Sequence, residues 1–115
     1  DIRILLFMNS ITWAFTNVPA KKEDILDSIP KGWHKIVSDL IDDLSHLGWD
    51  GRIFQVKEKF GGLRFYIDNG DHEIYDQINK AEQESYRTCE VCGQPGHLRT
   101  NRPWIRTLCD EHSVS

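Results

Sequence analysis

The C-terminal quarter of the chain contains the feature that most constrains its fold. All three cysteines lie there and, with one histidine, form a Cys-x2-Cys pair and a Cys-x2-His pair separated by 16 residues. Thiolates and an imidazole at such spacings are typical of tetrahedral zinc sites in zinc ribbons and fingers. We therefore predict that Zn2+ is bound by Cys89, Cys92, Cys109 and His112.

The predicted zinc is structural, because four ligands fill its coordination sphere and a catalytic zinc keeps an open position for water. His97 is an alternative fourth ligand, since four residues separate it from Cys92, as in a Cys-x2-Cys-x4-His-x4-Cys knuckle. That knuckle would need a cysteine where the chain has Arg102, so the spacing favours His112.

Length and charge limit the classes of function. A chain of 115 residues with 39% hydrophobic and 28% charged residues is expected to form one soluble domain, with at most a small appended module. The formal net charge is −4, whereas residues 87–115 alone have a balance of +1. Because nucleic-acid-binding domains are usually basic, such a role would have to lie in this C-terminal part.

The cysteines and the first residues indicate a compartment. An odd cysteine count fits a disulfide framework poorly, and thiolate–zinc sites favour a reducing environment, so we predict a cytoplasmic protein. Residues 2–15 are mostly apolar, but they are too few and too often interrupted by polar residues for a membrane span. Asp1 offsets Arg3, so the basic start of a signal peptide is missing. We expect a buried helix or strand here and no membrane partner.

The hydrophobic patterns predict an α+β fold. We expect a short helix or turn, an amphipathic helix, a β-hairpin and a second long helix at residues 21–29, 33–47, 52–60 with 63–67, and 71–86. Gly61 and Gly62 are expected to form the hairpin turn, and Asp71 is expected to cap the last helix. The chain is accordingly divided into an N-terminal segment whose role is left open, a helix–hairpin–helix body and a zinc-ribbon module, at residues 1–30, 31–86 and 87–115.

Five short motifs occur in order along the chain. They are GW at 32–33, QVKEKFGGLRFY at 55–66, AEQES at 81–85, TCEVCG at 88–93 and TLCDEH at 107–112. Over residues 31–113 the chain resembles a family of small uncharacterised proteins of bacteriophages, prophages and bacterial genomes. The resemblance implies a phage or mobile-element setting, with the host cytoplasm as the place of action and a host protein or defence system as the target.

Residues 93–107, here called the ribbon loop, contain the candidate binding residues Arg99, Arg102, Trp104 and Arg106. Arginines interleaved with an aromatic residue suit phosphate contacts and base stacking. A solvated loop with Trp104 packed against the body is the competing interpretation. The two are comparable, and the nearby acidic residues slightly favour the second.

The predicted hairpin contains an unusually polar set of residues, Lys57, Glu58, Lys59, Arg64 and Tyr66. They could form a recognition face or bind an anion. The simpler interpretation is an exposed sheet face with cross-strand ion pairs, each of which contributes little stability. The residues alone favour the simpler interpretation, whereas the family resemblance supports a recognition or anion-binding face.

Sequence signatures of enzymes fit this chain poorly. A zinc deaminase needs His-x-Glu and Pro-Cys-x-x-Cys, whereas here His72 and Glu73 are adjacent and Thr88 precedes the first cysteine. We therefore predict a non-enzymatic, zinc-stabilised binding protein that binds a host or defence protein, one form of which would be a counter-defence, anti-CRISPR-like inhibitor. Nucleic-acid binding through the ribbon loop is the main alternative, and a small metal-dependent nuclease or hydrolase is a third.

Overall fold

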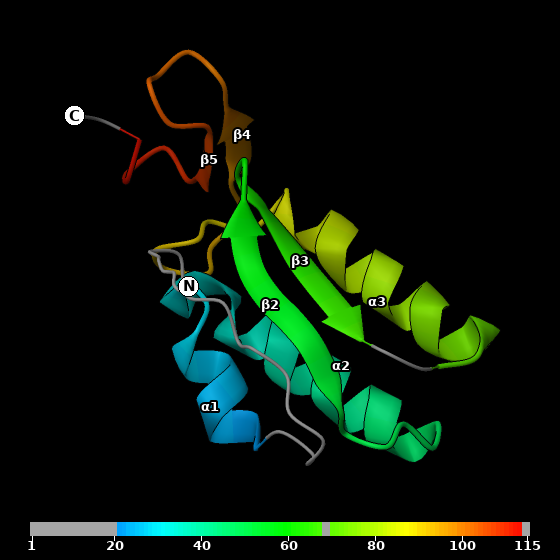
Figure 1. The fold of residues 1–115 in the computed structure, drawn as a ribbon. Coiled ribbons are helices and arrows are strands. Elements are labelled where there is room, and N and C mark those ends of the chain that lie inside the picture. The colour runs from blue at the N-terminus through cyan, green and yellow to red at the C-terminus, as the bar shows by residue number, and fades with distance from the viewer. Residues whose placement is uncertain (1–20, 68–69, 114–115) are drawn as a thin grey trace, which may run out of the picture.

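The computed structural model describes residues 21–67 and 70–113 and has the predicted α+β fold. Its elements, in chain order, are α1 (Lys22–Asp27), the 3-10 helix η1 (Lys31–Trp33), α2 (His34–His46), β2 (Ile53–Lys59), β3 (Gly62–Ile67), α3 (His72–Ser85), β4 (His97–Arg99) and β5 (Arg106–Leu108). In Figure 1, α2 and α3 lie along the β2–β3 hairpin, and the short β4–β5 hairpin lies beyond its turn. The prediction for residues 2–15 falls outside the described residues.

One hydrophobic core joins the helices and the β2–β3 hairpin. Trp33 and Leu44 bury the inner side of η1 and α2, and Leu63 and Phe65 come from alternate positions on the inner face of β3. Helix α1 packs against α2 and adds Ile25 to the same core. Within the two described ranges, no helix has the length and apolar character needed to cross a bilayer.

The two long helices begin and end where local chemistry predicts. The apolar residues of α2 recur at helical spacing and are buried, which confirms the amphipathic helix. Asp71 is the N-cap of α3, and its side chain accepts a hydrogen bond from the backbone N–H of Ile74 at 3.1 Å. Gly48, with a φ of 90°, ends α2 in the left-handed conformation that glycine adopts most easily.

The hairpin turn lies one residue earlier than predicted. Lys59 pairs with Gly62 across the strands, and the two residues between them, Phe60 and Gly61, have positive φ values of 53° and 81°. Positive φ at both central positions is the pattern of a tight type I′ hairpin turn. Gly62 belongs to β3 and is needed for a different reason, because a Cβ there would lie 2.3 Å from a ring carbon of Tyr86.

Helix α3 satisfies the outer edge of β3 with its side chains. The backbone N–H of Leu63 donates to the Ser85 hydroxyl, and that of Phe65 donates to the Glu82 carboxylate, each at 2.9 Å. Unpaired edge groups invite pairing with another chain, so this covering protects the hairpin. It also explains structurally why glutamate and serine occur at these two places in the AEQES motif.

Removing the Glu82 acceptor should destabilise the protein. We expect Glu82→Ala to lower the free energy of unfolding by about 1 to 3 kcal/mol, because it leaves a part-buried backbone N–H without its partner. Glu82→Gln keeps an acceptor and should cost clearly less. Burial raises the pKa of Glu82, so wild type should gain stability relative to Glu82→Gln as pH falls through that raised value towards the ordinary 4.5. Urea unfolding at neutral and acidic pH measures both effects, and equal losses for the two variants would contradict the assignment.

Candidate metal centre

The metal centre is built from two short knuckles on either side of a small hairpin. After α3 the chain turns back on itself, with the backbone N–H of Cys89 donating to Gln94 (2.8 Å) and that of Gly93 donating to Cys89 (2.9 Å). Strands β4 and β5 follow and pair in antiparallel fashion, with Leu98 opposite Thr107. The second knuckle begins directly after β5. This arrangement is compatible with the predicted ribbon, and it places the two ends of the ribbon loop next to each other.

The four predicted ligand atoms converge on one point. The Cys92 and Cys109 sulfurs are 3.8 Å apart, and the His112 Nδ1 lies 3.2 Å from Cys109 Sγ and 3.6 Å from Cys89 Sγ. All four ligand atoms lie within 4.8 Å of one another, so one metal ion could contact them all. The three cysteines are free thiols, because a disulfide requires a sulfur–sulfur distance of about 2.05 Å. His97, the alternative ligand, lies exposed on β4 outside this group.

The electrostatics of the cluster favour a bound cation. Burial alone would raise the pKa of the Cys89 thiol, but backbone N–H groups of Cys109, Cys92 and Val91 lower it to about 6. The backbone N–H of Gln94 lowers the pKa of Cys92, yet desolvation and the neighbouring Cys89 and Cys109 together raise it above its ordinary value. Closely spaced thiols oppose one another's ionisation, and a metal ion removes that opposition by balancing their charge.

Hydrogen bonds between segments distant in sequence join the metal module to the body. The backbone N–H of Gly32 donates to the Glu90 carbonyl (2.8 Å), and the Trp33 indole N–H donates to the Thr88 carbonyl (2.9 Å). The Thr107 hydroxyl donates to the carbonyl of Gly61 in the hairpin turn (2.6 Å). Sequence reasoning did not identify these residues as part of the site. The GW and FGG motifs could have indicated these residues, because the glycine backbone of each motif lies close to the module.

Two of the candidate arginines have structural partners. Arg99 donates to the Leu108 carbonyl from Nε (3.1 Å) and Nη2 (2.9 Å), and it pairs with Asp110 at 2.9 Å. Arg106 pairs with the buried Glu90 at 3.0 Å. Burial raises the pKa of Glu90, while the Arg106 charge and hydrogen bond oppose that rise. Both guanidinium groups therefore hold the module together.

Trp104 and Arg102 differ from these two arginines. Trp104 is 77% exposed, so the interpretation that it packs against the body is wrong. In Figure 1 the loop between β4 and β5 extends beyond the hairpin turn, away from α2 and α3. Arg102 forms no hydrogen bond or ion pair with any residue in the ranges 21–67 and 70–113. Both residues line a groove of about 520 Å3 together with Glu58, Glu90 and the remaining residues of 102–106.

The polar residues of the hairpin have mixed surroundings. Glu58 accepts a hydrogen bond from the backbone N–H of Gly61 (2.8 Å), and Arg64 donates to the Tyr86 hydroxyl (3.0 Å). Lys57 lies opposite Arg64, so like charges face each other across the strands. The cross-strand ion pairs expected from the sequence are absent among the described residues, because the carboxylate of Glu58 is used to close the turn. Tyr66 and Lys59 are exposed, and a recognition role for this face stays a prediction.

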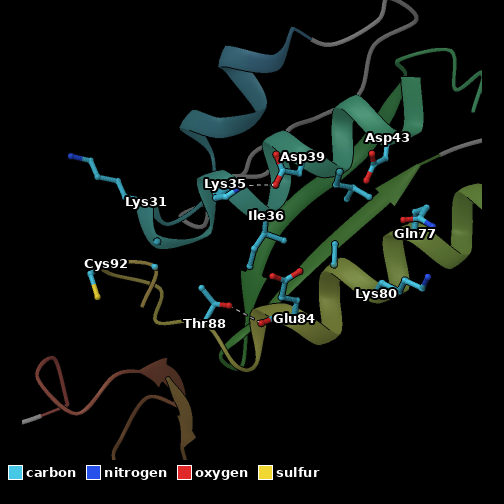
Figure 2. A pocket seen from close by; sticks show the side chains of 14 residues that line it. Lys31, Lys35, Ile36, Asp39, Asp43, Gln77, Lys80, Glu84, Thr88 and Cys92 are labelled. Atoms are coloured by element: carbon cyan, nitrogen blue, oxygen red, sulfur yellow. Dashed lines mark hydrogen bonds and ion pairs between the residues drawn. The ribbon is translucent and has the colours of Figure 1, made fainter. Parts of the chain in front are cut away.

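A second groove, of about 540 Å3, lies beside the first knuckle. Figure 2 shows Asp43 and Lys35 of α2 on one side, Lys80 of α3 on the other, and Cys92 near one end. Lys35 is paired with Asp39 on its own helix at 2.9 Å. The apolar residues lining the groove, Ile36, Leu40 and Ala81, are buried. The groove therefore presents mainly charged side chains of both signs.

Among the residues that the structure describes, the Cys3His cluster is the group with the geometry of a metal site. Comparison of the chain with protein-family models, with curated proteins and with solved structures gives no match. The chemistry assigned to the centre therefore follows from its donor atoms and their separations.

Proposed function

We propose that this chain is a non-enzymatic, zinc-stabilised binding protein of phage or mobile-element type that binds a protein of the host or of its defence system. The observation that supports this proposal most strongly is the Cys3His cluster, whose four donor atoms can fill a tetrahedral coordination sphere. Tetrahedral zinc with Zn–S and Zn–N bonds of about 2.3 and 2.05 Å places ligands about 3.8 Å (S···S) and about 3.6 Å (S···N) apart. Two of the observed separations, 3.8 Å between Cys92 and Cys109 and 3.6 Å between Cys89 and His112, match these values, whereas Cys109 and His112 lie closer, at 3.2 Å.

A structural zinc ion suits this site better than a catalytic one. Three thiolates and one imidazole complete the tetrahedron, so no position is left for a reacting water. Zinc bound in this way contributes folding free energy to a small module whose own hydrophobic cluster consists of Cys89, Leu108 and Cys109. The metal then supports a surface and takes no part in a reaction.

The distribution of charge favours a protein partner over a nucleic acid. The chain has a net charge of −4, and Arg99 and Arg106 are engaged with partners inside the module. An exposed tryptophan is characteristic of the centres of protein–protein interfaces. The resemblance to phage and prophage proteins supports a partner in the host cytoplasm.

Nucleic-acid binding is the second candidate, because the guanidinium of Arg102 lies on the same loop as the exposed ring of Trp104. A nucleic-acid complex would weaken steeply as salt is raised, and Arg102→Ala would lessen that slope by about one counterion. Salt-insensitive or absent binding to single-stranded and duplex DNA and RNA would reject this candidate.

Two measurements test the main proposal. Metal analysis at neutral pH should find about one tightly held zinc ion per chain. Affinity purification of the zinc-loaded chain from host lysate should return one protein in stoichiometric amount, and the chelator-treated chain should not. The proposal fails if the chain holds no zinc or if no protein is enriched above a control resin.

A further inference from the structure

We propose that the groove between β2 and the ribbon loop binds an extended segment of a partner protein that carries an apolar side chain next to a carboxylate. This inference rests on the proposed protein-binding function and assigns the surface that performs it. The groove is the 520 Å3 concavity lined by Glu58, Glu90 and residues 102–106.

The apolar part of the recognition is assigned to Trp104. Its ring is 77% exposed, and two further exposed apolar residues, Phe60 (63%) and Leu98 (41%), come from the hairpin turn and from β4. The turn and β4 adjoin, because a Cβ on Gly61 would lie 2.6 Å from Leu98 Cδ1. Large exposed apolar side chains on a small domain indicate an interaction surface. Tryptophan and arginine are the residues most enriched at the energetic centres of such surfaces.

The charged part of the recognition is assigned to Arg102. Arg106, the other cation in the groove, is neutralised by Glu90 at 3.0 Å. Arg102 has no such partner in the part of the chain that the structure describes, so it is available to a carboxylate of the partner. A guanidinium binds a carboxylate through two parallel hydrogen bonds, which fixes the direction of the bound segment.

Two adjacent residues hold the end of the ribbon loop in place before any partner arrives. Thr107 is bonded to the carbonyl of Gly61 at 2.6 Å, and Arg106 is bonded to the buried Glu90. The metal cluster fixes the chain just beyond β5. A surface held in this way loses little conformational entropy on binding, so that a modest contact area can give useful affinity.

The same groove is poorly suited to a nucleic-acid strand. Glu58 lines it with a carboxylate that no cation among the described residues neutralises, and this charge would face a phosphate backbone. A polypeptide with one carboxylate placed near Arg102 avoids this repulsion, because its other side chains need not be charged. The partner segment is therefore expected to be acidic at one position rather than along its whole length.

Selection from a displayed library of random peptides on the zinc-loaded full chain tests the proposal. The expected peptides place an aspartate or glutamate beside an aromatic or large aliphatic residue. Trp104→Ala should weaken their binding by about tenfold or more. Arg102→Glu should weaken them similarly and shift the selection towards lysine-containing peptides. Two control variants on α3, Tyr75→Ala and Lys80→Glu, change an exposed ring and an exposed cation away from the groove and should leave binding unchanged.

The outcomes separate this surface from the proposed function. If the selected peptides bind Trp104→Ala and Arg102→Glu as tightly as wild type, the surface is wrong and protein binding stands. The surface is also wrong, and protein binding also stands, if no peptide is enriched while a host protein is still captured. Enrichment of neither a peptide nor a host protein rejects both proposals. Tighter binding of a single-stranded oligothymidylate than of any selected peptide also overturns the inference.

Discussion

Replacing His112 by alanine should lower the affinity for zinc by roughly a hundredfold and unfold the ribbon module when zinc is limiting. Structural zinc sites in small peptides bind with about 10 to 16 kcal/mol, so each of four ligands accounts for about 3 kcal/mol. The His112 Nδ1 lies within 3.6 Å of both Cys89 and Cys109 sulfurs, and no described side chain stands ready to replace it. Competition with a chromogenic chelator gives the affinity, and amide exchange over residues 87–113 gives the order of the module.

His97→Ala is the matched control, because His97 is the alternative ligand that the sequence offers. It lies exposed on β4 and outside the ligand cluster, so its loss should leave zinc affinity unchanged and alter stability by less than about 0.5 kcal/mol. A large loss of zinc affinity in His97→Ala with none in His112→Ala would show that the ligand set is assigned to the wrong histidine.

Gly32→Ala should be strongly destabilising, although it adds only one methyl group. A Cβ at this position would lie 2.0 Å from the Cys89 carbonyl oxygen and 2.5 Å from the Glu90 carbonyl carbon, which are both backbone atoms. The knuckle would have to move away from η1 and lose the hydrogen bond from Gly32 to Glu90 (2.8 Å). We expect the free energy of unfolding of the zinc-loaded protein to fall by about 3 kcal/mol. Denaturant unfolding measures this loss.

Gly48→Ala separates crowding from backbone strain. Gly48 has a φ of 90°, and a Cβ added there would meet nothing within 4 Å, so alanine should cost only the strain of a left-handed backbone, about 1 to 2 kcal/mol. Both variants should still bind zinc, since neither glycine is a ligand. A Gly32→Ala protein as stable as Gly48→Ala, or more stable, would contradict a close contact between the GW motif and the knuckle.

The elements that could be predicted from sequence are those with a local cause. The burial of one face of α2 follows from the spacing of its apolar residues, and the start of α3 follows from the Asp71 side chain. The hairpin turn could be predicted only to within one residue. Gly61 and Gly62 both satisfy the local preference for a turn, but the ring of Tyr86, which is distant in sequence, requires glycine at 62.

The binding residues show the same limit more strongly. Arg99, Arg102 and Arg106 are equivalent in the sequence, as cations spaced along one polar loop. Their partners make them different, because Asp110 and Glu90 engage Arg99 and Arg106 and leave Arg102 available. The exposure of Trp104 could not be predicted from the sequence either, because an aromatic residue in a loop can pack inwards or face solvent depending on the surface beneath it.

By itself, the sequence determined the donor set of the metal centre and the order of its helices and strands. Ligand spacing and hydrophobic periodicity depend on residues that are close in sequence, so they can be read without knowledge of the tertiary structure. Only the tertiary structure decided how the metal module is attached and what it presents. Gly32 bonds to Glu90 and Thr107 bonds to Gly61 across distant segments, and Trp104 is left exposed on the attached module. No local pattern encodes such contacts, because they depend on the packing of the whole body.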